Sequence, residues 1–321
     1  MGRVGTLAPA ARAPAEALRV LEEAERALDP ASPLTPWVRA GNERHRGPIR
    51  DGTALGSLWI GPKDEAVGLA LWSEPSGAGR HVAVALSDGY QTAAALASFV
   101  RALDADGPLR TVGGPVPGVA DPEVTAALRP LGFLAVERVD MVFPDATPTP
   151  SVAERPGFPS RTLDASDRSR LAGLIERTYA DTPIDRWLFA RTLADDYGEA
   201  AAAELLGTGV GVWHPEASFG IEADGRLVAA TLVNDLEGPL LSEVMVDPAW
   251  RRRGFARRLV ARSIASVRQH RLGTLRLVVT VGNDRAEPLY RSLGFAATPL
   301  RATLWLRLPL TASGAAEASS R

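Results

Sequence analysis

The chain has 321 residues, enough for about two domains of ordinary size, and its 45% apolar and 23% charged residues are typical of a folded globular protein. Its 36 basic and 38 acidic side chains leave a net charge of -2, which does not favour nucleic-acid binding, and no stretch approaches the roughly 18 consecutive apolar residues of a membrane span. The absence of cysteine and the four scattered histidines exclude disulfides and thiolate chemistry and give no metal-ligand spacing, so we expect no metal site.

The first 30 residues lack the apolar block of a secretory signal, so we expect a cytoplasmic protein with an N-terminal helical segment over 1–30. Hydrophobic periodicity then predicts strands over 67–73, 81–86, 109–112 and 136–143 and helices over 92–103 and 122–131. These elements define a first domain over 31–143.

Five prolines between positions 144 and 159 prevent a continuous helix or a central strand. We therefore expect a linker over 144–157 and a second domain over 158–310. The last residues, 311–321, are mostly small and have little to bury, which predicts a disordered tail.

The second domain begins with helices over 164–179, where Asp164 is a candidate N-cap, and over 185–197. Asp224-Gly225 predicts a hairpin between strands over 218–223 and 227–234. Strands over 240–246, 275–280 and 302–308 alternate with helices over 254–269 and 284–293. This order predicts a mixed α/β (α+β) fold.

The end of the first domain repeats the end of the second. LRPLGF over 128–133 aligns with YRSLGF over 290–295, and each stands at a helix exit before an apolar strand. Chance recurrence is the alternative, because glycine is common at helix ends. The matching order of elements on both sides favours a domain duplication.

The segment LSEVMVDPAWRRRGFA over 241–256 predicts an anion site. An apolar strand leads through arginines and Gly254 into a helix, so backbone N–H groups and the positive end of the helix dipole converge. Residues 251–271 contain eight arginines and no acidic residue. The alternative is an arginine-rich helix face exposed to solvent.

Arg251-x-x-Gly254-x-Ala256 resembles the acyl-coenzyme A pyrophosphate loop of the GNAT superfamily of N-acetyltransferases. Residues 283–286 (NDRA) and 289–295 (LYRSLGF) are similar to the second signature of that family. The resemblance implies two GNAT-like domains, each a mixed, mostly antiparallel, splayed sheet flanked by helices. It also implies acetyl transfer from acetyl-coenzyme A, as co-substrate, to a primary amine through a tetrahedral intermediate.

The resemblance further implies how the cofactor would bind. The strand before the phosphate loop would offer backbone groups to the pantetheine arm, and Asn283 would hydrogen-bond the same arm or cap the following helix. The implied cofactor-binding residues are Val244, Met245, Val246, Arg251, Arg252, Arg253, Gly254, Phe255, Ala256 and Asn283.

Tyr290 stands at the position of the family's general acid, where a phenol would protonate the leaving thiolate. A buried core aromatic is the alternative. Glu243 is the candidate general base, directly or through water, because a carboxylate within an apolar strand is costly unless it faces a wet cleft. The reserve candidates are Asp235, Glu237 and His214.

The first domain lacks these features: Asp88 follows its strand where an anion would bind, and Leu128 replaces Tyr290. We interpret it as a degenerate copy beside an active second domain, an architecture also found in mycothiol synthases. A coenzyme A-binding regulatory module without turnover is the other hypothesis. The acceptor would be a small-molecule or peptide amine, and the chain a monomer or homodimer. The acidic segment over 180–217 suits a cationic amine or a solvent-exposed helix.

Overall fold

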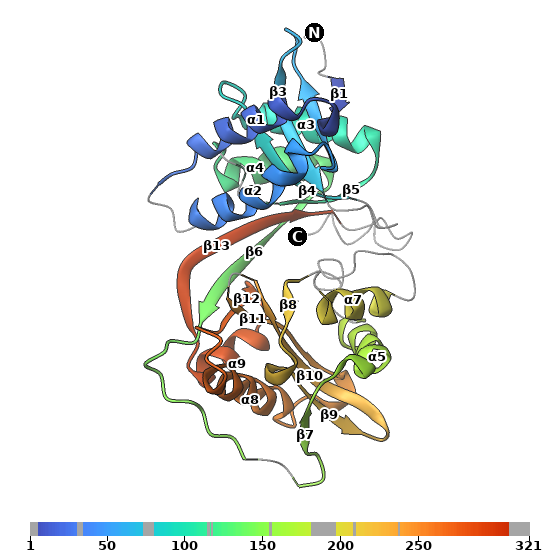
Figure 1. The fold of residues 1–321 in the computed structure, drawn as a ribbon, viewed down its shortest axis with the longest axis vertical. Helices are drawn as coiled ribbons and strands as arrows, with labels where there is room; N and C mark the ends of the chain where they lie inside the picture. Colours follow the sequence, from blue (N-terminus) through green and yellow to red (C-terminus); the bar gives the residue numbers. More distant parts are fainter. Residues whose placement is uncertain are drawn as a thin grey trace. The chain divides into compact units, whose positions relative to one another are not determined.

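The computed structural model describes residues 6–30, 35–72, 80–113, 116, 118–153, 156–180, 197–207, 210–236 and 238–307. The chain divides into unit 1, Met1–Glu137 with Ala302–Arg321, and unit 2, Arg138–Arg301. Each unit is an α/β body with a mostly antiparallel sheet flanked by helices, which confirms the predicted fold class (Figure 1). The predicted tail and all but the last residue of the predicted helix over 185–197 lie outside the described residues.

The strands of unit 1 follow one another in the sheet in the order β1 (Thr6–Pro9), β2 (Gly56–Ile60), β3 (Ala66–Trp72), β4 (Arg80–Leu86), β5 (Leu109–Gly113) and the end of β13 (Ala296–Leu306). Neighbours are antiparallel except β4 and β5, which are parallel. Trp305 of β13 is fully buried, and its Nε1 donates a hydrogen bond to Thr125 Oγ1 at 3.0 Å. The last strand of the described residues thus completes the sheet of unit 1.

Helices cover both faces of the unit 1 sheet: α1 (Pro14–Arg26) and α2 (Thr35–Arg50) on one, and α3 (Ala93–Asp106) and α4 (Asp121–Leu128) on the other. Val20 of α1 shares a buried cluster with Leu69 of β3. Phe99 of α3 and Leu128 of α4 share a second cluster with Val84 of β4. The described part of the predicted segment over 1–30, residues 6–30, therefore belongs to unit 1, and α1 packs into its core.

The strands of unit 2 stand in the order β6 (Leu134–Val142), β12 (Arg276–Thr280), β11 (Pro239–Val246), β10 (Arg226–Asp235), β9 (Phe219–Ala223) and β7 (Ser160–Thr162), and β8 (Val212–Trp213) also pairs with β10. Of β6, residues 138–142 belong to unit 2 and pair with β12. The β9–β10 hairpin turns at Asp224 and Gly225, whose φ angles of 50° and 73° are those of the predicted tight turn.

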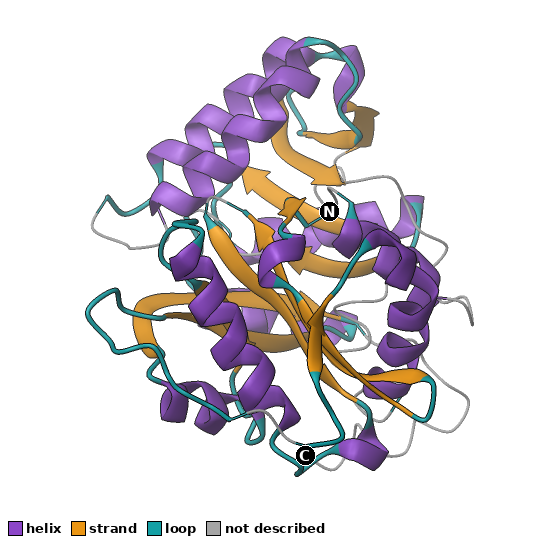
Figure 2. Cartoon of the chain, turned by 60° about the horizontal axis from the view of Figure 1, so that its bottom comes forward, coloured by secondary structure: helices purple, strands orange, loops and turns teal. Residues whose placement is uncertain are grey.

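Two helix pairs cover the two faces of the unit 2 sheet (Figures 1 and 2). The first pair is α8 (Phe255–Gln269) and α9 (Ala286–Leu293), whose Ile264 and Leu293 pack with Val279 of β12. The second is α5 (Arg168–Tyr179) and α7 (Tyr197–Leu206), which pack with Leu232 of β10. The predicted helices at 164–179 and 254–269 correspond to α5, with a preceding 3-10 turn at Ala165–Asp167, and to α8.

Three arginines of α8 hold the Pro-rich segment that follows β6. Arg268 donates to Pro144 O at 3.1 Å and to Asp145 O at 2.9 Å. Arg258 donates to Phe158 O and Arg262 to Ser160 O, each at 2.6 Å. Because guanidinium groups satisfy these carbonyls, the segment needs no regular secondary structure to lie on the helix.

Candidate active site

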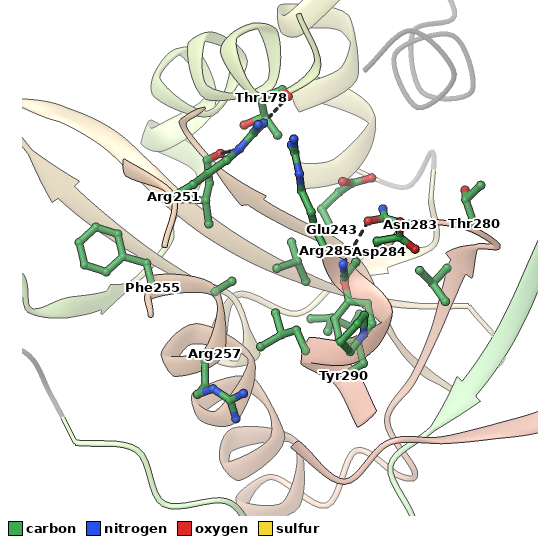
Figure 3. Close-up of a pocket in the computed structure, with 18 of the residues that line it drawn as sticks. Thr178, Glu243, Arg251, Phe255, Arg257, Thr280, Asn283, Asp284, Arg285 and Tyr290 are labelled. Atoms are coloured by element: carbon green, nitrogen blue, oxygen red, sulfur yellow. Dashed lines mark hydrogen bonds between the residues drawn. The ribbon is translucent and has the colours of Figure 1, made fainter. Parts of the chain in front are cut away.

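The parallel strands β11 and β12 separate soon after they begin. Along these two strands one register pair, Leu240 with Arg276, joins them. Beyond that pair a cleft of about 890 Å³ lies between the strands (Figure 3). The edges that face it therefore lack ladder hydrogen bonds, which an extended ligand could supply. This is the splayed pair that the GNAT resemblance implies.

A β-bulge in β11 sets the direction of the side chains on the cleft wall. Leu232 of β10 pairs with Glu243 and Val233 with Leu241, so Ser242 is an extra residue in β11. Its Oγ donates to Asn234 Oδ1 at 2.6 Å. Because of the bulge, Leu241 and Val244 both pack toward α8 and α9 although they are three residues apart.

Glu243 lies on the opposite face of β11, where α5 packs. The phenol of Tyr179, the last residue of α5, donates a hydrogen bond to Glu243 Oε2. Tyr179 was not among the site residues predicted from the sequence. It follows Leu171 and Ile175 at intervals of four residues on the buried face of the helix, and this spacing was the available signal.

A turn and two arginines fix the chain between β11 and α8. The carboxylate of Asp247 accepts a backbone N–H two residues on at 3.0 Å and the Arg177 Nε at 2.6 Å. Arg251 donates to Val246 O at 3.3 Å and to Thr178 O at 3.1 Å (Figure 3). Both arginines therefore join the end of α5 to the loop that precedes α8.

Gly254 directly precedes α8 with φ 79°, in the left-handed region. A Cβ at this position would meet no atom within 4 Å, so the space in front of the helix is open. The first N–H groups of a helix have no intrahelical partner, and the helix dipole favours an anion there. The local geometry fits the predicted phosphate loop, whose glycine serves both the turn and the approach of a ligand.

The arginines of α8 do not act together at this loop. The sequence indicates that the eight arginines of residues 251–271 concentrate positive charge at the anion site, but Arg258, Arg262 and Arg268 instead bind carbonyl groups of the residues that follow β6. Arg253 stacks on the Trp250 ring at 4.4 Å from its centroid. The arginines that line the cleft from this segment are Arg251, Arg252 and Arg257.

Asn283 and Tyr290 form the wall contributed by α9 and the residues before it (Figure 3). The Asn283 Oδ1 accepts the Ala286 N–H at 3.1 Å, so this residue caps the helix. Tyr290 is 8% exposed and packs edge-on against Phe295, with ring centroids 5.9 Å apart. It is a core aromatic that also borders the cleft, so the two interpretations of Tyr290 are compatible.

Ten of the twelve predicted site residues line this cleft; Met245 and Arg253 do not. The Met245 side chain is buried against α5 and α7. His214 lies outside the lining, with its Nδ1 2.9 Å from Glu216 Oε1, and Asp235 lies near it. Glu237 is outside the described residues. The lining also includes residues that the sequence analysis did not select, among them Arg138, Thr178, Tyr179, Thr280 and Arg285.

The corresponding strands of unit 1 stay together. β4 and β5 pair at four positions, from Arg80 with Leu109 to Ala83 with Gly113. In the loop after β4, the Asp88 N–H donates to Glu23 Oε2 at 3.1 Å. Burial raises the pKa of Glu23, but hydrogen bonds from Arg19 and from this N–H outweigh it and hold the pKa below its usual range. A charged carboxylate therefore stands where a phosphate would have to bind.

None of the helices in the described ranges is long and apolar enough to span a membrane. Within the same ranges, no group of three or more His, Asp or Glu side chains is arranged to hold a metal ion.

Residues 186–295 match the model of the acetyltransferase (GNAT) family, which confirms the resemblance found in the sequence. No curated protein matches the chain. A GCN5-related N-acetyltransferase from Sphaerobacter thermophilus is similar in structure, with a TM-score of 0.60 and 16% identity over 94% of this chain and 95% of that one.

Two further solved structures match nearly the whole chain. A GNAT-family acetyltransferase from Colwellia psychrerythraea has a TM-score of 0.52 and 10% identity over 95% of this chain and 100% of its own. A tandem GNAT protein from the clavulanic acid biosynthesis pathway has a TM-score of 0.51 and 16% identity over 94% of this chain and 97% of its own. At these identities the likeness shows a shared GNAT fold.

Proposed function

We propose that unit 2, the part of the chain that carries the GNAT-family match, is an N-acetyltransferase that moves an acetyl group from acetyl-coenzyme A to a primary amine. The observation that supports this most is the cleft between β11 and β12, which has Glu243 on one wall and Tyr290 on the other. A site that only bound a cofactor would not need a candidate base and a candidate acid facing the same space.

The residues around the cleft fit coenzyme A. The unpaired edge of β11 over 241–246 would hydrogen-bond the pantetheine arm, and the N-terminus of α8 with Arg251 and Arg252 would hold the pyrophosphate. Open space at Gly254 leaves room for close approach. Acetyl-coenzyme A would supply an acetyl thioester, whose carbonyl carbon the amine attacks.

Two proton transfers then fall to side chains of this chain. Glu243 would accept a proton from the amine, directly or through water, while Tyr179 holds its carboxylate in place. Tyr290 would donate its phenolic proton to the leaving thiolate, because a phenol is protonated at neutral pH. Asn283 would orient the pantetheine arm through the amide nitrogen that its capping bond does not use.

Unit 1 would have a structural role in a tandem arrangement, since its β4 and β5 remain paired and its loop holds Glu23. The expected acceptor is a small-molecule or peptide amine, and a cytoplasmic location and a monomeric or homodimeric state remain predictions.

A thiol-release assay with acetyl-coenzyme A and a panel of amines tests the reaction. The proposal predicts release that depends on both substrates and a mass increase of one acetyl group on the amine. Binding of coenzyme A without release on any amine would instead support the regulatory-module hypothesis.

A further inference from the structure

Glu243 shares one face of the unit 2 sheet with Val278 of β12 and Arg138 of β6. Val279 of β12 and Val139 of β6 pack in the cluster with α8 and α9. Because side chains alternate along a strand, Val278 and Arg138 point to the other face, the same face as Glu243. All three residues line the cleft.

β12 lies between β11 and β6 in the sheet. From β11 to β6 this face therefore carries Glu243, then Val278 and Thr280 of β12, and then Arg138, which lies opposite Thr280 in the register. Val278 exposes 38% of its surface, so an apolar floor separates the two charged groups. Two strand spacings put the backbones of β11 and β6 roughly 10 Å apart, and more where β11 and β12 diverge.

Arg138 is an incompletely paired cation. Its Nη2 donates to Val278 O at 3.2 Å. Its Nε is buried and has no hydrogen-bond partner in the part of the chain that the structure describes. Within the same described ranges, no carboxylate forms an ion pair with it. A guanidinium without a carboxylate partner would be stabilised by a forked hydrogen-bonded contact with a carboxylate or phosphate.

The neighbouring arginine on the same face, in contrast, forms an ion pair with a carboxylate. Arg276 donates to Asp140 Oδ1 at 2.8 Å, and the other oxygen of Asp140 accepts from Thr298 Oγ1 at 2.9 Å. The Asp140 side chain is 5% exposed, so this acid is committed to its own partners. The fold thus neutralises Arg276 with Asp140, whereas no carboxylate of the described residues neutralises Arg138.

Two anions could come to this cleft: the phosphates of the cofactor or an anionic group on the acceptor. The cofactor phosphates have the N-terminus of α8 with Arg251 and Arg252, at the end of β11. Arg138 instead lies two strands away, on the face where Glu243 would receive the amine. The acceptor is therefore the better source of the anion.

We propose that Arg138 binds a carboxylate or phosphate carried by the acceptor, so that the enzyme acetylates amines that bear an anionic group a few bonds from the nitrogen. This inference rests on the proposed function. The amine would face Glu243, the carbon chain would lie over Val278, and the anion would pair with Arg138. No covalent step is added to the proposed transfer.

The test compares matched amines that differ in charge: β-alanine with propylamine, and O-phosphoethanolamine with ethanolamine. Wild-type protein should prefer the anionic member of each pair in kcat/KM. Arg138→Gln should lower kcat/KM for the anionic member roughly 10- to 100-fold more than for its neutral partner, the usual range for a charged hydrogen-bonded contact. Arg138→Lys, which keeps the charge, should recover part of that loss.

Arg226→Gln is the matched control, because it removes an exposed arginine of β10 in the same unit. It should not alter the preference. An equal loss on both members of each pair in Arg138→Gln would make the residue structural and overturn the inference. The inference would also be overturned if Arg138→Gln weakened the binding of coenzyme A but not of 3′-dephospho-coenzyme A. Arg138 would then bind the 3′-phosphate of the cofactor.

Calorimetric titration of β-alanine into the chain loaded with coenzyme A separates the two proposals. If no amine releases thiol but Arg138→Gln weakens β-alanine binding, the anion site stands and the transfer reaction fails. If thiol is released without preference for anionic amines, the reaction stands and the anion site fails.

Discussion

The phenol of Tyr179 at the end of α5 donates a hydrogen bond to Glu243 Oε2 on β11, across 64 positions of sequence. This hydrogen bond positions the candidate base against the end of α5. The same helix end binds the predicted phosphate loop, because Arg251 donates to the carbonyl of Thr178. A single junction thus orients both the proton acceptor and the loop expected to hold the cofactor.

Tyr179→Phe should lower kcat while leaving the KM for acetyl-coenzyme A close to normal. The variant keeps the ring but frees the Glu243 carboxylate to leave its orientation, and misplacement of a reacting group costs about 10- to 100-fold in rate. Steady-state kinetics with any accepted amine measures the effect.

Tyr197→Phe is the matched control. Tyr197 belongs to the same buried cluster, and its hydroxyl donates to Glu176 O at 3.2 Å, but it does not line the cleft. Turnover should be normal in this variant. Equal losses of turnover in both variants would mean that Tyr179 supports the packing of α5 rather than Glu243.

Gly254→Asn should abolish coenzyme A binding without unfolding the chain. Asparagine tolerates the left-handed conformation better than most residues, and the structure has room for a Cβ. The added side chain would, however, occupy the space in front of α8 that a phosphate needs. Calorimetry measures binding and a thermal melt measures folding.

Gly225→Asn is the control that separates a loss of coenzyme A binding from a change in stability. Gly225 has φ 73° and equally open surroundings, but it lies in the β9–β10 turn outside the cleft. Both variants should melt at similar temperatures, and only Gly254→Asn should lose the cofactor. Normal binding of coenzyme A by Gly254→Asn would mean that this loop does not hold the phosphates.

Local signals allowed much of unit 2 to be predicted. The Asp224-Gly225 turn, the apolar strand over 240–246 and the arginine-glycine start of α8 each depend on neighbouring residues, and the structure has the corresponding elements. Asn283 and Tyr290 could be selected for the same reason, because a short motif carries them.

The remaining features depend on contacts that are distant in sequence. Arg138 reaches the cleft because β6 pairs with β12, and Trp305 is buried in unit 1 because β13 pairs with β5. Periodicity predicts a strand but does not identify its partner. The residues after β6 also lacked a local signal for their docking on α8, since Arg258, Arg262 and Arg268 bind mainly backbone carbonyl groups, which every residue has.

Coenzyme A should bind with a stoichiometry near one per chain. Unit 2 has the separated strands, whereas β4 and β5 of unit 1 stay paired and Glu23 uses the N–H of Asp88. Titration of the intact chain should show one class of site, and Gly254→Asn should remove it completely. A second site that persists in that variant would place a cofactor in unit 1.

Arg307→Gln should destabilise the chain more at neutral pH than in acid. Hydrogen bonds from Arg307 hold the pKa of Asp104 below its ordinary value of 3.8, although burial opposes them. Because the pKa of Asp104 is lower in the folded state, the charged pair stabilises the fold at pH values above the ordinary pKa of 3.8. This contribution is lost as the pH falls through the folded pKa.

Screening by solvent limits the expected loss to about 0.5–1 kcal/mol at pH 7, because both side chains are partly exposed. Denaturant unfolding of both proteins at pH 7 and pH 3 measures it. The difference should be smaller at pH 3, which lies below the ordinary pKa of 3.8, because the unfolded chain there binds a proton at Asp104 that the ion pair opposes in the folded chain. A constant difference would assign the effect to the bond from Arg307 to Leu109 O rather than to the ion pair.

Tyr290→Phe tests the candidate acid. The ring packs against Phe295 and would keep this contact, so the melting temperature should change little, because a buried hydroxyl is worth only about 1 kcal/mol net. Cofactor affinity should also stay close to normal. Turnover should fall by about 10²- to 10⁴-fold, the range for losing a positioned proton donor, because the departing thiolate would depend on water. A normal turnover number, with chemistry shown to limit the rate, would restrict Tyr290 to its role in the core and leave proton delivery to solvent.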